Sequence, residues 1–137
     1  MLIASVFLLF LAPFFKKKLK ISKNILFKLL FCGLIISLHW VFFFKAIKVS
    51  NVSITLSILS LGAFITSFLE PILYNRKIIL YEVFLGFLVV IGTAIIFKTQ
   101  FHYLEGIIYA FISVILSVFF TLFNGKLVGK ISSFTIS

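Results

Sequence analysis

The sequence predicts an all-α, polytopic membrane protein with about five transmembrane helices, and three observations support this. Five apolar stretches are separated by short basic loops, 63% of the residues are hydrophobic, and only 12% are charged. An α-helix rises about 1.5 Å per residue, so about 20 apolar residues cross a hydrocarbon core of about 30 Å. The stretches are Met1–Phe15, Ile25–Phe44, Val49–Leu73, Ile78–Phe97 and Gly106–Phe123.

The composition and the run lengths argue against the other fold classes. A soluble domain is roughly 45–50% apolar. A soluble protein of this composition would have too little polar surface to face water. The strands of a membrane β-barrel alternate apolar and polar residues. Ile78–Phe97 and Gly106–Phe123 are instead apolar on most faces.

The basic residues predict the orientation of the helices. The net charge is +10, and ten of the thirteen Lys and Arg residues fall in alternate loops or at the helix ends beside them. Such loops stay in the cytoplasm, so the first stretch is expected to run inward and the second outward. The cations lie at helix ends and are not interleaved with aromatics on one face, which argues against nucleic-acid binding. The ten are Lys16, Lys17, Lys18, Lys20, Lys23, Lys28, Arg76, Lys77, Lys126 and Lys130.

The first stretch, Met1–Phe15, is short for a membrane span. Its 15 residues would cover about 22 Å as a helix, and the lysine pattern places Met1 outside the cell with no basic residue before it. We therefore expect an upstream helix to be missing. Ile131–Ser137 begins another mixed stretch that stops, so the sequence is interpreted as a fragment.

The second stretch, Ile25–Phe44, carries the most unusual side chains for its depth. His39 and Trp40 fall about two-thirds of the way along it. An ionisable side chain inside a membrane is costly and is a functional candidate, because it must be bonded inside the bundle or line a wet cavity. Trp40 could equally be an interfacial aromatic. Cys32 is expected to pack as a small hydrophobic residue.

The third stretch, Val49–Leu73, has serines at helical spacing on one face. Small hydroxyl residues allow close helix packing and bonds between helices, and they can also line a polar cavity. Thr55 and Thr66 are expected on the opposite face, so the pattern predicts that Ser57→Leu does more damage than Thr55→Leu. The serines are Ser50, Ser53, Ser57, Ser60 and Ser67.

The stretch ends with a carboxylate that needs a partner. Glu70 lies near the C-terminal end of the predicted helix, where a negative charge is unfavourable to the macrodipole. Arg76 or Lys77 is expected to pair with it at the membrane edge.

The fifth stretch carries a second row of small residues, which is expected to serve helix packing. These are Gly106, Ala110, Ser113, Ser117 and Thr121.

The chain offers little for catalysis. It has three acidic residues, no Asp, two histidines and one cysteine. No zinc-binding HExxH motif, paired carboxylates at helical spacing or glycine-rich phosphate loop is present in the sequence. We therefore expect no enzyme activity, no metal site and no cofactor.

The order of several short motifs resembles the EamA domain of the drug/metabolite transporter superfamily, over about Leu2 to Phe97. The resemblance implies a five-helix repeat that occurs twice with inverted topology, ten helices in all. Residues 1–98 would then be the first repeat without its first helix, and residues 104–137 would open the second. The motif residues are Trp40, Phe43, Phe44, Ala46, Ser50, Leu69, Glu70, Pro71, Asn75, Arg76, Lys77, Glu82, Gly86 and Gly92.

The resemblance implies part of a secondary transporter that exports small organic metabolites or amino acids. Its partners would be the bilayer, the solute and the remaining helices of the same protein, and its place the cytoplasmic membrane of a bacterium. Inverted repeats form a cavity near the midplane. A small non-transporting membrane protein for assembly or scaffolding is the alternative. The residues expected at the cavity are His39, Trp40, Phe43, Ser53, Ser57 and Ser60.

Overall fold

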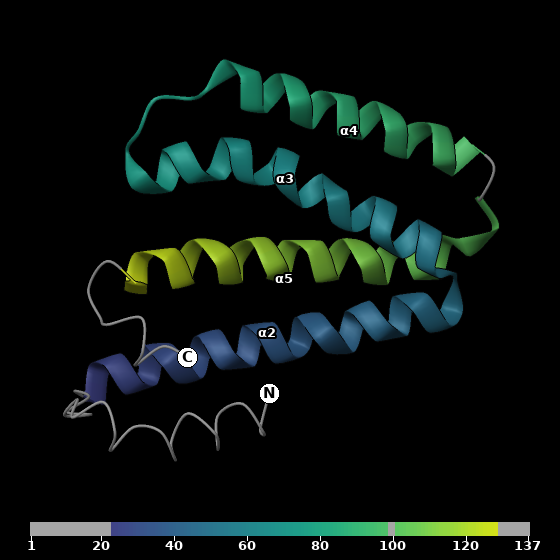
Figure 1. Cartoon of the computed structure of the whole chain (residues 1–137). Helices are drawn as coiled ribbons and strands as arrows, with labels where there is room; N and C mark the ends of the chain where they lie inside the picture. Colours follow the sequence, from purple (N-terminus) through teal and green to yellow (C-terminus); the bar gives the residue numbers. More distant parts are fainter. Residues whose placement is uncertain (1–22, 99–100, 129–137) are drawn as a thin grey trace, which may run out of the picture.

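The computed structural model describes residues 23–98 and 101–128, and these residues form helices joined by short connections (Figure 1). The four α-helices are each long and apolar enough to cross a membrane, which confirms the predicted helical membrane fold for four of the five stretches. The first stretch, Met1–Phe15, lies outside the described residues. The elements are α2 (Lys23–Val49), α3 (Val52–Tyr74), α4 (Leu80–Lys98), the short 3₁₀ helix η2 (Phe101–Tyr103) and α5 (Leu104–Val128).

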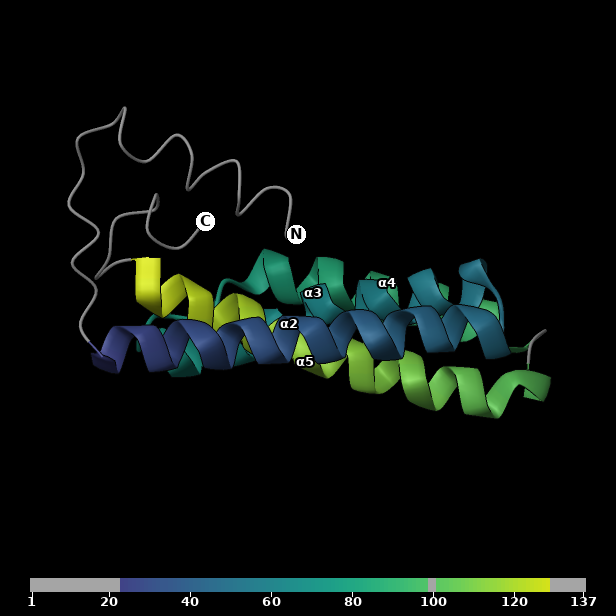
Figure 2. The same ribbon diagram turned by 90° about the horizontal axis from the view of Figure 1, so that it is seen from below.

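The four helices lie side by side in the order α4, α3, α5, α2 (Figure 1), and Figure 2 shows α2 next to α5 from a second direction. The helix α5 runs antiparallel to α2 and parallel to α3. Although α2 and α3 are consecutive in the chain, α5 lies between them over most of their length. The spatial order therefore differs from the order along the chain.

The helix ends follow from local chemistry. Asn51 caps α3, because its side chain accepts a hydrogen bond of 2.9 Å from the backbone N–H of Ile54. Asn75 ends α3 in the left-handed conformation, with φ 51°, which asparagine tolerates better than most residues. The helix α2 continues through Lys45 and Lys48 to Val49, beyond the predicted end at Phe44. Its 27 residues correspond to about 40 Å, so its ends reach past the hydrocarbon core.

The hydrophobic core is centred on α5. Four of its seven buried residues belong to this helix, and they pack on α2 and α3. Gly62 of α3 lies beside Val114 and Val118 of α5, where a Cβ would make only ordinary van der Waals contacts, at 3.6 and 3.7 Å. The core residues are Ala46, Ile54, Ile58, Ala110, Val114, Val118 and Leu122.

Gly86 and Gly106 lie at close contacts between segments of the chain. A Cβ at Gly86 of α4 would come within 2.9 Å of the Cα of Phe64 in α3. A Cβ at Gly106 would overlap Ser50, at the turn between α2 and α3. These contacts fix where α4 crosses α3 and where the start of α5 enters beside that turn.

The orientation predicted from the lysines can be tested at two exposed positions. In a Cys32→Ala background, we expect Lys77→Cys to react with an impermeant maleimide only after the cells are opened. His102→Cys, on the connection at the opposite end of the bundle, should react in intact cells. Labelling of position 77 in intact cells would contradict the predicted orientation and indicate the opposite one.

Candidate functional site

The side chain of His39 is bonded between α2 and α5. Its Nδ1 lies 2.9 Å from the carbonyl oxygen of Ser113 and 2.9 Å from the Ser113 hydroxyl. Since a carbonyl oxygen only accepts, Nδ1 carries the proton and donates to Ser113. The Ser113 hydroxyl donates in turn to the His39 carbonyl oxygen at 3.2 Å. His39 is 5% exposed, so the imidazole finds its partner inside the bundle.

Aromatic rings continue from His39 along α2. The His39 ring lies 5.3 Å from Trp40 and 6.0 Å from Phe43, measured between ring centroids. Trp40 and Phe43 contact each other edge to face at 5.5 Å. Trp40 is 41% exposed, and Phe43 is half-buried, so the two rings form an open aromatic surface beside a buried histidine.

The serines of α3 lie on the side of α4, away from the core. The Thr93 hydroxyl of α4 donates to the carbonyl oxygen of Ser57 at 3.1 Å. Ser57 and Ser60 direct their own hydroxyls to carbonyl oxygens within α3, at 2.7 and 2.6 Å. Ser53 and Ser60 are exposed and Ser57 is half-buried. The stripe therefore packs against α4 at Ser57 and is open at Ser53 and Ser60. Ser67, in contrast, is buried, and Ser50 lies against Gly106 of α5.

Thr55 lies on the face of α3 opposite the serines, as expected, but the expectation that only the serine face meets neighbouring helices was wrong. Thr55 is fully buried on the core side of α3, and its hydroxyl donates to the carbonyl oxygen of Asn51 at 2.9 Å. The reason is that α5 covers the face of α3 opposite the serines, and Thr55 lies on that face. Thr55, and not Ser53, Ser57 or Ser60, therefore faces the core.

The expected order of damage is therefore reversed. We expect Thr55→Leu to lower the free energy of unfolding by about 1–3 kcal/mol, because the larger side chain has to enter a filled core. Ser57→Leu should cost less, since that side chain is partly open. Thermal unfolding of both variants in detergent measures the difference, and a less stable Ser57→Leu would contradict this placement.

The structure does not bring the two groups of expected cavity residues together. His39, Trp40 and Phe43 lie on α2, where the histidine faces α5. Ser53, Ser57 and Ser60 lie on the side of α3 toward α4. The interpretation of one shared cavity assumed that α2 and α3 are neighbours, whereas α5 separates them. The residues therefore form two separate surfaces.

A cavity of about 390 Å³ lies between α3 and α4, and most of its surface is apolar. Ser67 is the serine of the stripe that lines it, and Thr66, which was expected on the opposite face of α3, lines it too. The cavity extends from the middle of α3 to the end that carries Glu70. Hydroxyl groups and two carboxylates share it with apolar side chains. The lining residues are Ala63, Thr66, Ser67, Glu70, Glu82, Leu85, Gly86 and Val89.

An ion-pair network lies at the end of this cavity. The Nη2 atom of Arg76 lies 2.9 Å from Oε1 of Glu70 and 3.9 Å from Oε2 of Glu82. The guanidinium thus joins the end of α3 to the first turn of α4. Lys77, the other expected partner of Glu70, is exposed. In the described ranges, no group of three or more His, Cys, Asp or Glu side chains could hold a metal.

Sequence reasoning missed three of the residues that organise these surfaces. Ser113 was visible as one member of the small-residue row on the fifth stretch, but its bond to His39 depends on α5 lying beside α2. Glu82 was noted only as a motif residue, and Thr93 had no signal beyond being a polar residue in an apolar helix. Of the three, only Ser113 depends on a helix order that the sequence does not display, whereas Glu82 and Thr93 contact residues of the preceding helix or the connection to it.

The comparisons with known proteins agree with the helical architecture. The EamA-like transporter family matches residues 1–98, which include α2, α3 and α4. Comparison with curated proteins gives no match, and neither does comparison with solved structures. The match covers more than two thirds of the 137 residues, and its described helices are long enough to cross a membrane. The chain belongs to the EamA-like transporter family.

Proposed function

We propose that this chain forms part of a secondary transporter that exports small organic metabolites or amino acids across the cytoplasmic membrane of a bacterium. The observation that carries the proposal is the cavity between α3 and α4, lined in part by hydroxyls and carboxylates, in a member of a transporter family. Hydroxyls and carboxylates are expensive inside a membrane unless they are bonded or line a wet cavity. A cavity that leads from the middle of a spanning helix to its end is suited to admit a polar solute.

The charges at the end of the cavity favour a small solute that carries both signs. Arg76 lies between two carboxylates, so an amino acid could exchange its ammonium group with the guanidinium and its carboxylate with Glu70 or Glu82. All three side chains are about one-third exposed or more, so the exchange does not require a deeply buried charge to lose its partner. The ion pairs then act as the place where a solute enters or leaves.

The serines would contact the solute on α3, and the aromatic rings would form a separate aromatic wall on the other side of α5. Ser53, Ser57 and Ser60 lie on the same helix as the cavity, toward its other end, and the hydroxyls of Ser57 and Ser60 bond to carbonyl oxygens of α3. Trp40 and Phe43 offer an exposed aromatic surface on α2. We assign His39 to the same surface as a support, since its ring contacts both aromatics while its nitrogen bonds to Ser113.

The remaining helices of the same protein would enclose this path. The helices α2 and α4, at the two ends of the row, expose many large apolar side chains, among them Phe44, Val41, Phe84 and Ile95. Helices of an inverted second repeat can cover such faces and place the solute path near the midplane. The rest of the exposed apolar surface would face lipid.

We expect Glu70→Gln to lower solute flux per folded molecule by at least about tenfold, because charge-assisted bonds of this kind contribute about 1.5–3 kcal/mol. The assay measures counterflow of labelled amino acids in vesicles, with the protein expressed from its complete gene. Glu105→Gln is the matched control, since Glu105 is exposed at the opposite end of the bundle. Trp40→Leu and Phe87→Leu test the aromatic wall in the same way.

Equal flux in Glu70→Gln and Glu105→Gln would contradict a role for the cavity. Absence of counterflow by the unaltered protein, at normal membrane abundance, would favour the scaffold alternative.

A further inference from the structure

The structure has a second cavity, on the opposite side of α5. It measures about 280 Å³ and lies between α2 and α5, at the end of the bundle where Tyr74 also lies. Lys28 and Lys126 come from the two helices, and aromatic and aliphatic side chains form the rest of the lining. We call this cavity the lysine groove. Its residues are Phe27, Lys28, Phe31, Cys32, Phe123, Lys126 and Leu127.

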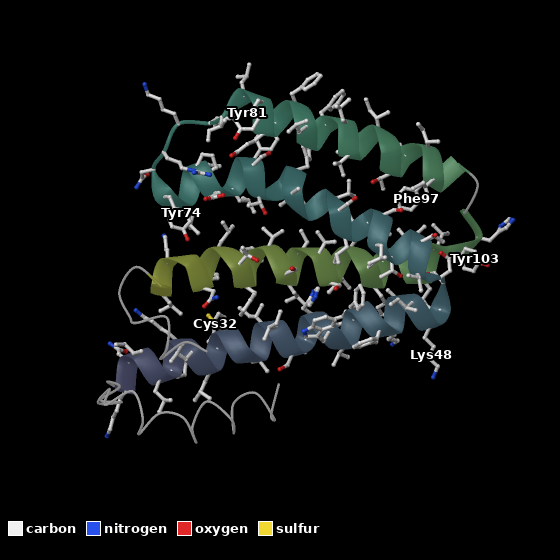
Figure 3. All side chains as sticks on the ribbon, in the orientation of Figure 1. Cys32, Lys48, Tyr74, Tyr81, Phe97 and Tyr103 are labelled. Carbon is white, nitrogen blue, oxygen red and sulfur yellow. The ribbon has the colours of Figure 1, made fainter. Side chains whose placement is uncertain are left out.

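The antiparallel packing of α2 and α5 builds this groove. Lys28 precedes Phe31 and Cys32 by three and four residues, so the three share one face of α2. Lys126 follows Phe123 by one turn on α5. Phe31 and Phe123 meet edge to face with their centroids 6.4 Å apart. Cys32 is buried between the two helices (Figure 3). The result is an apolar floor with one cation from each helix.

The charges of the groove are not neutralised by the protein side chains around it. None of its lining residues is acidic. Of the acids in the described part of the chain, Glu70 and Glu82 pair with Arg76, and Glu105 lies at the other end of α5. Lys126 also lies 5.9 Å from the centre of the Tyr74 ring, a contact that holds the cation near the groove but leaves its charge in place. The site therefore attracts an anion.

We propose that the lysine groove binds an anionic phospholipid, with the headgroup phosphate at Lys28 and Lys126 and an acyl chain over Phe31 and Phe123. A soluble anion would leave the aromatic floor exposed, whereas a lipid satisfies both the charges and the apolar surface. Phe27 and Phe31 are 71% and 48% exposed, so the floor is accessible from the bilayer. Basic pockets between membrane helices at the cytoplasmic side are suited to such headgroups.

A tryptophan placed in the groove can report which lipid occupies it. The natural Trp40 is first replaced in a Trp40→Phe background, and Phe123→Trp then supplies the only tryptophan. The full chain is reconstituted into mixed vesicles, and quenching is compared for brominated phosphatidylglycerol and brominated phosphatidylcholine. A second reporter, Phe87→Trp, samples the exposed face of α4. The nearest lysine within α4 is Lys98, at the end of the helix, so this reporter lies away from basic residues of its own helix.

We expect phosphatidylglycerol to be preferred at position 123 by up to roughly 25-fold, since each of the two lysines near an anionic headgroup contributes about a factor of five. At position 87 the two lipids should quench about equally. Lys28→Gln with Lys126→Gln should bring the preference at position 123 close to that at position 87. Lys48→Gln with Lys77→Gln removes the same charge outside the groove and should leave the preference unchanged. Lys28→Arg with Lys126→Arg should retain it.

Three results would overturn the proposal. Equal loss of preference in the two double glutamine variants would mean that only the general surface charge attracts the lipid. Loss of preference on adding inorganic phosphate, at constant ionic strength, would assign the site to a free anion. Weak quenching by both lipids at position 123 would mean that protein covers the groove. The helical circular-dichroism signal of each variant shows that the comparison is made on folded protein.

Discussion

Replacing Gly86 by alanine should destabilise the packing of α4 on α3 by about 1–3 kcal/mol, the usual cost of overpacking. The added methyl group would lie 2.8 Å from the Phe64 ring and 2.9 Å from its Cα. A side chain could rotate away, but the backbone of α3 cannot move without separating the two helices. Gly86→Val should have a larger effect, because a branched side chain needs still more room at the same point.

Gly92 supplies the matched control on the same helix. A Cβ at Gly92 has no neighbouring atom within 4 Å. We therefore expect Gly92→Ala to be neutral or to stabilise α4 by up to about 1 kcal/mol, through the higher helix propensity of alanine. The free energy of unfolding in mixed micelles compares the two variants. If both changed it by the same amount, the close contact between α3 and α4 would not contribute to stability.

Replacing His39 by leucine should lower the free energy of unfolding by about 1–2 kcal/mol, because the bonds between His39 and Ser113 join α2 to α5 in the core. His102→Leu is the control, since His102 is exposed on the connection before α5 and should change stability by no more than about 0.5 kcal/mol.

A double-mutant cycle separates this contact from other effects of the substitution. Ser113→Ala alone should cost less than His39→Leu, because the Ser113 carbonyl oxygen remains as an acceptor. The combined variant should be more stable than the sum of the single losses predicts, by up to about 1.7 kcal/mol. Strict additivity would show that the two side chains do not interact. Flux per folded molecule should fall with Trp40→Leu more than with Ser113→Ala.

The sequence predicted the helices well because length and apolar composition decide whether a segment crosses a membrane. It could not predict their order in space. In α4 and α2 most positions are apolar, so periodicity alone does not indicate which face meets another helix. The contacts that set the order are absences of side chains, at Gly86 and Gly106, and these leave little signal in a single sequence.

The serine stripe also shows why the sequence does not reveal which face of a helix meets a neighbour. A serine in a helix can satisfy its hydroxyl with the carbonyl oxygen of the preceding turn, as Ser57 and Ser60 do. Such a serine does not require a neighbouring helix, so the stripe did not identify the core side of α3. Thr55 satisfies its hydroxyl within the chain too, and its fully buried position follows from α5 alone.

The position of α5 also constrains how the protein is made. The ribosome synthesises about 5–20 residues per second, so α5 is completed roughly 3–10 seconds after α3. During that interval the faces of α2 and α3 that α5 later covers lack their final partner. The helix α5 is the last of the four described helices to be made, and it supplies four of the seven core residues. The core of the described part of the chain is therefore completed only at the end of its synthesis.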